Sequence, residues 1–154
     1  MAGSDFIFNI AKGRTRTFAE LSGANDALVW VLLKATGLEA DSTLKDYDTL
    51  AAILAGTNDE ADFTGYSRIA ATNVVVSIDD TADEMVVDID PFQYDPAGGA
   101  ANNLMGKVLL CYDPDTTGGT DADIIPIAAY SFDGQTDGST MIINPNQDGA
   151  YYSA

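Results

Sequence analysis

Histidine is absent from the sequence and cysteine occurs once, as Cys111. One thiol excludes an intramolecular disulfide and a cysteine cluster for zinc. The lack of histidine excludes the pairs in which an imidazole activates a serine or cysteine nucleophile. No GxxxxGK[ST] or GxGxxG phosphate-binding motif occurs. The sequence therefore predicts a protein that is not an enzyme and that uses no cofactor.

Positive charge is also scarce, with 7 Lys and Arg against 24 Asp and Glu, which gives a formal net charge of −17. Such a field repels phosphate backbones and anionic lipids, so neither nucleic acid nor a membrane is expected as a partner. Three of the cations, Lys12, Arg14 and Arg16, cluster before Phe18 in "AKGRTRTF". Together with Phe18, this cluster predicts a basic arm that docks on an acidic partner surface. The alternative is a solvated strand with alternating charges.

Long apolar segments are missing as well. The longest unbroken run, Ala27 to Leu33, is far shorter than the ~20 residues that a membrane-spanning helix needs. Residues 1–10 lack the basic start and apolar stretch of a signal peptide. A chain of 154 residues is long enough for one domain with its own core. We therefore expect a single soluble domain.

The acids are 20 Asp and only 4 Glu, a balance typical of turns rather than helices. Apolar and alternating runs predict strands within residues 27–36, 66–79, 85–94, 104–113, 123–133, 139–146 and 150–154. Pro91 should interrupt its strand. Helical spacing predicts one short helix over about residues 45–55, which Asp41, Ser42 or Asp48 would cap and Gly56 would end. The fold class is mainly β, an antiparallel β-sandwich or open barrel over residues 24–154, with an extended N-terminal arm over residues 1–23.

The segment "CYDPDTTGGTDADIIP" contains four aspartates, Asp113, Asp115, Asp121 and Asp123. Set against the EF-hand pattern from Asp113, its twelfth position is Ile124 instead of the bidentate glutamate, and strand-like sequence flanks it. An EF-hand is therefore excluded, and a weaker calcium loop on the four aspartates is the less favoured alternative. The favoured interpretation is a turn between two core strands, in which Gly118 and Gly119 supply positive φ angles.

Aromatic residues could serve either the core or an interface, where Tyr and Trp are enriched. Trp30 lies in the continuous apolar run and is expected in the core. Phe92, Tyr94, Tyr151 and Tyr152 are candidate interface aromatics for which both roles remain open.

Several stretches together resemble a family of small virion structural proteins of tailed bacteriophages. The resemblance covers most of the chain from Ala11 onward and is strongest in "LKATGLEADSTLKDYDTLAAILAG" and "CYDPDTTGGTDADIIPI". It implies a capsid decoration or cement protein on the exterior of the virion, made in the bacterial cytoplasm. The implied partners are the major capsid protein and further copies of the chain, with a trimer favoured. The acidic body and the absence of disulfides agree with this role.

Two alternatives stay open beside the decoration protein. One is a structural protein of the tail or of a fibre attachment, which would use the same domain to bind tail subunits. The other is a calcium-dependent carbohydrate-binding module, in which the Asp-rich loop and exposed tyrosines would form the site.

Overall fold

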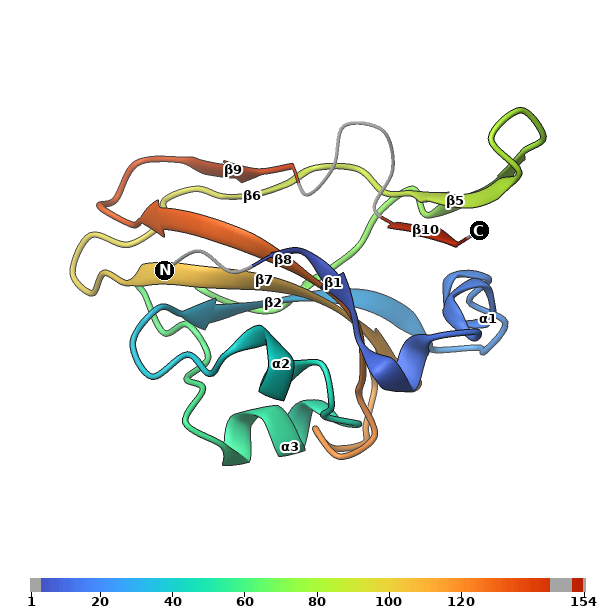
Figure 1. Ribbon diagram of the computed structural model, residues 1–154. Coiled ribbons are helices and arrows are strands. Elements are labelled where there is room, and N and C mark those ends of the chain that lie inside the picture. The colour runs from blue at the N-terminus through green and yellow to red at the C-terminus, as the bar shows by residue number, and fades with distance from the viewer. Residues whose placement is uncertain (1–3, 145–150, 154) are drawn as a thin grey trace.

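The computed structural model describes residues 4–144 and the backbone of residues 151–153. The chain is mainly β and antiparallel, as the sequence predicts (Figure 1). Its elements in chain order are β1 Phe6–Ile7, the 3₁₀ turn η1 Asn9–Ala11, α1 Thr15–Ala19, β2 Ala27–Lys34, α2 Asp41–Leu44, α3 Leu50–Ala55, β3 Ile69–Ala70, β4 Val75–Asp79, β5 Glu84–Asp88, β6 Phe92–Tyr94, β7 Leu104–Asp113, β8 Ile125–Gln135, β9 Met141–Ile143 and β10 Tyr151–Ser153.

The largest sheet has the strand order β1-β8-β7-β2-β3, with antiparallel neighbours throughout. Its centre is formed by β2, β7 and β8, the longest strands of the described chain. The β2–β7 register runs from Ala27 opposite Asp113 to Lys34 opposite Met105, and it shifts at Lys34. A second irregularity lies at Gly106, where the β7–β8 register also shifts.

The central strands are buried on both faces because a layer packs on each side of the large sheet. Along β2, Leu28, Trp30 and Leu32 enter one core, whereas Val29, Val31 and Leu33 enter the other. Strand side chains alternate between the two faces, so a strand covered on both faces must be apolar without interruption. This explains the run from Ala27 to Leu33 and confirms that Trp30 is a core residue.

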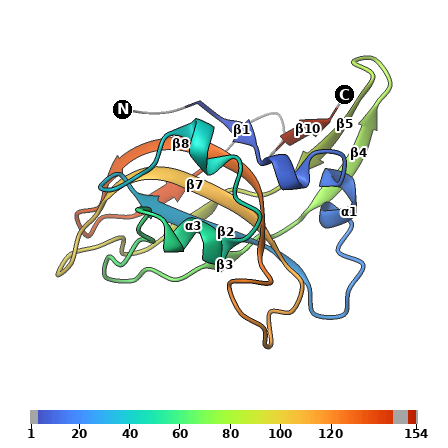
Figure 2. The same ribbon diagram turned by 60° about the horizontal axis from the view of Figure 1, so that its bottom comes forward.

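The layer over the first face consists of two small sheets, β10-β5-β4 and β6-β9. Met85 and Val87 of β5, Phe92 and Tyr94 of β6, and Ile143 of β9 are buried in this core. Pro91 separates β5 from β6, as expected for a residue that cannot donate a ladder hydrogen bond. The β4–β5 hairpin projects beyond the sheet at one end of the molecule (Figures 1 and 2).

The layer over the other face contains α2 and α3, whose Leu44, Leu50 and Ile53 fill the second core. The helix predicted over about residues 45–55 is therefore only partly present, since α3 begins at Leu50 and a separate turn, α2, precedes it. The cap residue is Thr49, whose Oγ1 accepts a hydrogen bond from Ala52 N at 3.1 Å, and not one of the predicted caps. Gly56 ends the helix as expected.

The N-terminal segment lies along the body from Ser4 onward. β1 pairs with β8, and Phe8, Ala11 and Phe18 are buried. Residues 15–19 form α1, so the alternative of a solvated strand over this segment is wrong. Its alternation of charged and small residues resembles a strand, but the contacts of Phe18 and Ala19 with the core favour a helical turn.

Candidate binding surfaces

The Asp-rich segment forms the connection between β7 and β8, which confirms the hairpin interpretation. Ile124, the residue at the place of the EF-hand glutamate, is buried in the second core. Gly119 has a φ of 82°, whereas Gly118 does not adopt a positive φ. One of the two glycines therefore needs the left-handed conformation, instead of the two expected.

Its aspartates are occupied by local hydrogen bonds and by one distant cation. Asp115 accepts from Thr117 N and Oγ1 at 3.0 and 2.6 Å, and Asp123 accepts from Thr120 N and Oγ1 at 2.9 and 3.0 Å. Asp113 accepts from the backbone N of Asp115 at 3.0 Å. These bonds stabilise the turn itself. Within residues 4–144, no group of three or more metal-binding side chains lies close enough to hold an ion.

The fourth aspartate, Asp121, belongs to an ion-pair network that ties the loop to the body. Both of its oxygens accept from Arg68, at 2.6 and 3.0 Å, and Arg68 also donates to both oxygens of Glu60, at 2.8 and 2.7 Å. The hydrogen bonds from Arg68 lower the pKa of Asp121. The pKa of Arg68 is raised, first by Glu60 and then by Asp121. The network fixes one conformation of the loop.

The predicted basic cluster is split between surface and core. Lys12, Arg14 and Arg16 are exposed, and Arg16 pairs with Glu20 at 2.7 Å. Phe18 is buried, with its ring 5.1 Å from that of Tyr112, and Arg14 stacks over it at 4.9 Å. The three cations therefore form a basic corner where η1 leads into α1, whereas Phe18 anchors this corner and is not available to a partner.

The structure describes the side chains of two of the four candidate interface aromatics. Phe92 and Tyr94 are buried in the first core, where Phe92 stacks on Trp30 with ring centroids 5.0 Å apart. The hydroxyl of Tyr94 donates to Ser67 O at 2.8 Å. An interface role is therefore wrong for both side chains. The side chains of Tyr151 and Tyr152 lie outside the described residues.

Lys107 is the residue that sequence reasoning missed most clearly, because its side chain is 0% exposed in the middle of β7. Its Nζ lies 3.0 Å from Asp41 Oδ1, and it donates to Ser4 O at 3.0 Å and to Ser131 Oγ at 3.3 Å. The Phe6 ring lies 5.2 Å away. This one ammonium group joins β1, α2, β7 and β8.

The other acceptor oxygen of Asp41 completes this arrangement by accepting from Ser4 N at 2.6 Å. Burial alone would raise the pKa of Asp41, but the hydrogen bonds from Lys107 and Ser4 outweigh burial and lower it. Asp41 therefore remains ionised beside the buried lysine.

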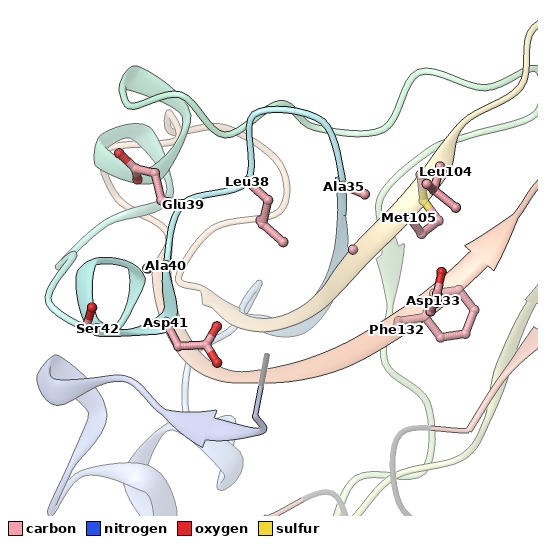
Figure 3. Close-up of a pocket in the computed structure, with 11 residues that line it drawn as sticks. Ala35, Leu38, Glu39, Ala40, Asp41, Ser42, Leu104, Met105, Phe132 and Asp133 are labelled. Carbon is pink, nitrogen blue, oxygen red and sulfur yellow. The ribbon is translucent and has the colours of Figure 1, made fainter. Parts of the chain in front are cut away.

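An open cleft of about 660 Å³ lies between the segment that leads into α2 and the ends of β7 and β8 (Figure 3). Its apolar lining comes from Ala35, Leu38, Ala40, Leu104, Met105, Gly106 and Phe132, and its polar lining from Glu39, Asp41, Ser42 and Asp133. Leu104 is 46% exposed. Gly106 allows a close approach here, since a Cβ on it would lie 2.7 Å from Leu38 Cδ2.

The charge of this cleft is negative. Its described lining includes three acids and no cation. Glu39 turns toward Tyr47 and Asn58, which both donate to it. Asp133 is exposed, and Asp41 points into the space in Figure 3. A concave surface of this size suits a side chain or loop that is apolar along its length and cationic at its end.

Comparisons of the chain with protein-family models, with curated proteins and with solved structures found no match. Within the described residues, none of the helices has the length and apolar character needed to cross a bilayer.

Proposed function

We propose that this protein is a virion structural protein of a tailed bacteriophage, and specifically a capsid decoration protein that binds the outside of the shell. The observation that carries the proposal is the open cleft, with its apolar and acidic lining. A site of this chemistry fits a basic, amphipathic loop of a capsid subunit. The resemblance of "CYDPDTTGGTDADIIPI" and neighbouring stretches to phage virion proteins supports the same conclusion.

The charge of the molecule supports an exterior position. At −17 the body is repelled by packaged DNA, and an acidic exterior remains well solvated. Attachment then depends on local complementarity, which the cleft supplies through the exposed Asp133, since Asp41 is already paired with Lys107. Charge complementarity of this kind selects the partner and speeds association.

The mechanism is adhesive. The large sheet forms a rigid body with the cleft at the end where β7 begins and β8 ends, and the β4–β5 hairpin at the other end (Figure 1). A body that binds only assembled subunits stabilises the shell by mass action, because unbound subunits gain nothing from it. In this account the buried Lys107 network keeps the cleft wall at Asp41 in place.

The test uses phage particles assembled without this protein and the purified protein added back. Wild-type protein should cosediment with these particles and saturate over the shell. Leu104→Lys places a cation in the cleft and should weaken binding by about tenfold or more, because it repels a basic partner and removes apolar contact. Ile142→Lys is the matched control, since Ile142 is 65% exposed but does not line the cleft.

Two results would contradict the proposal. Wild-type protein that does not bind these particles would overturn the function. Equal binding of the Leu104 and Ile142 variants would remove the cleft from the mechanism.

A further inference from the structure

β4 is an edge strand, and it is the most exposed apolar strand of the described chain. β4 is last in the sheet order β10-β5-β4, and within the described residues it pairs with β5 alone. Four of its five residues are exposed, and Val75 and Ile78 are 54% and 59% exposed. Edge strands are usually protected by charges, prolines or bulges on the strand itself. β4 carries one charge, Asp79, at its end.

The charges around this edge are separated along the strand. The tip of the hairpin carries Asp79, Asp80, Asp83 and Glu84. The base of the hairpin contacts α1, which belongs to the basic corner of Lys12, Arg14 and Arg16. Figure 2 shows α1 beside the start of β4, with the tip pointing away from it. The hairpin is therefore acidic at one end and faces basic residues at the other.

We propose that β4 pairs antiparallel with β4 of a second copy of this chain, about a two-fold axis. Antiparallel pairing reverses one hairpin relative to the other, so each acidic tip lies at the basic corner of the other copy. A two-fold axis makes this contact twice. With the axis at Ser77, Ile78 of each copy lies opposite Val76 of the other on the same face of the joined sheet.

This pairing extends the apolar face that β5 already begins. Within one copy, Ile78 lies opposite Met85 and Val76 opposite Val87. The joined sheet therefore continues the row of Val87 and Val76 into Ile78 of the second copy, so the exposed Ile78 of each copy packs beside Val76 of the other. Cross-strand apolar pairs and new ladder hydrogen bonds are the stabilising interactions.

Two features of the charge distribution oppose the pairing. Each copy has a net charge of −17, so the copies repel each other. Asp88 also lies opposite Val75 at the base of the hairpin, where its carboxylate repels the acidic tip of the other copy. Non-specific repulsion therefore predicts that any reduction of net charge strengthens association. The contact between tip and corner predicts the reverse when the tip loses its acids.

The acidic surface expected for Arg14 and Arg16 is then the hairpin tip of another copy. Arg16 remains accessible for this contact because its pair with Glu20 lies on the surface, where the two side chains are 62% and 48% exposed. The contact differs from the trimer that the resemblance implies. It does not depend on the capsid function, because the cleft lies at the other end of the sheet.

The first experiment measures self-association of the purified full chain by sedimentation velocity, from about 1 µM to 1 mM. The wild-type chain should form dimers. Ile78→Lys should raise the dimer dissociation constant by about tenfold or more, because the changed pair occurs twice across the axis. Ile142→Lys adds the same charge at a similarly exposed site on β9 and should leave the constant unchanged. Circular dichroism and thermal melts confirm that both variants fold.

The second experiment exchanges the charges. Arg14→Glu with Arg16→Glu changes the net charge by two units per residue, from −17 to −21, and Asp80→Lys with Glu84→Lys changes it from −17 to −13. Each variant alone should dimerise more weakly than wild type, and their equimolar mixture should form heterodimers at about wild-type strength. Asp79 is left intact because it accepts from Thr81 N and Ala82 N in the turn.

Three results would overturn the proposal. They are a wild-type chain that stays monomeric up to about 1 mM, a trimer in place of a dimer, and tighter association of the Asp80 and Glu84 variant than of wild type. A monomer that still coats the phage shell would remove this contact and leave the proposed function intact. A dimer that does not bind the shell would overturn the proposed function and leave this contact intact.

Discussion

Replacing Asp41 by Asn tests whether the buried Lys107 network holds the N-terminal segment and the cleft wall on the sheet. The substitution keeps the shape of the side chain and removes its charge. It leaves the ammonium group of Lys107, which is 0% exposed, without its only carboxylate partner within the described residues. The remaining acceptors, Ser4 O at 3.0 Å and Ser131 Oγ at 3.3 Å, are neutral.

The expected loss of unfolding free energy follows from the burial of the pair. Removing one partner of a buried ion pair costs about 3–5 kcal/mol, because the other charge stays buried without compensation. The Asp41 side chain is 24% exposed, so water reaches the site and the lower end, about 3 kcal/mol, applies. Lys107→Met removes the buried charge, fills its space and leaves the partly exposed Asp41 with Ser4 N as donor, so it should cost less than Asp41→Asn. The double variant should cost less than the sum of the two.

Urea unfolding at pH 7, followed by Trp30 fluorescence, measures these differences. Glu20→Gln is the control, because it breaks the exposed Arg16–Glu20 pair and should cost about 1 kcal/mol or less. If Asp41→Asn costs no more than this control, the Asp41–Lys107 pair does not hold the segment on the sheet. Costs at Asp41 and Lys107 that simply add would give the same conclusion, since residues that form a pair show a coupling energy.

Three further predictions concern other parts of the molecule. Arg68 lowers the pKa of Asp121, so this pair stabilises the fold above pH ~4, and its contribution is lost as the pH falls through the folded pKa. The difference in unfolding free energy between wild type and Asp121→Asn, measured with urea, should therefore shrink below pH ~4. Burial raises the pKa of Cys111, so a thiol reagent at pH 8 should label it no faster than the chain unfolds, and fast labelling of native protein would refute its burial. Gly106→Ala would place a methyl group 2.7 Å from Leu38 and should destabilise the fold by about 1–3 kcal/mol in thermal melts, whereas an unchanged melting temperature would show that the segment before α2 yields.

The β class and the central strands could be predicted because their signals are local. An unbroken apolar run such as Ala27 to Leu33 has few solutions besides a strand buried on both faces, and β2 confirms it. Pro91 and Gly56 act through their own backbone, so the ends of β5 and α3 were also correct. Ile124, in place of the EF-hand glutamate, correctly indicated a turn between two core strands instead of an EF-hand.

The errors arose where tertiary contacts decide the structure. Arg68 and Asp121 are 53 residues apart, and no local pattern shows that they meet. Lys107 reads as a surface residue in "GKVLL" because its partners Asp41 and Ser4 come from distant segments. The same limit applied to Phe92 and Tyr94, whose burial depends on β6 packing over Trp30. The cleft also escaped prediction, since its lining joins residues 35–42 to residues 104–106 and 132–133.

A cryo-electron microscopy map of the phage particle would show where each copy lies and which end of it faces the shell. We expect density over the outside of the capsid, with the cleft between α2 and β7 against a capsid subunit and with β4–β5 hairpins meeting in pairs. Density confined to the tail, or copies on the shell whose cleft faces solvent, would contradict this arrangement.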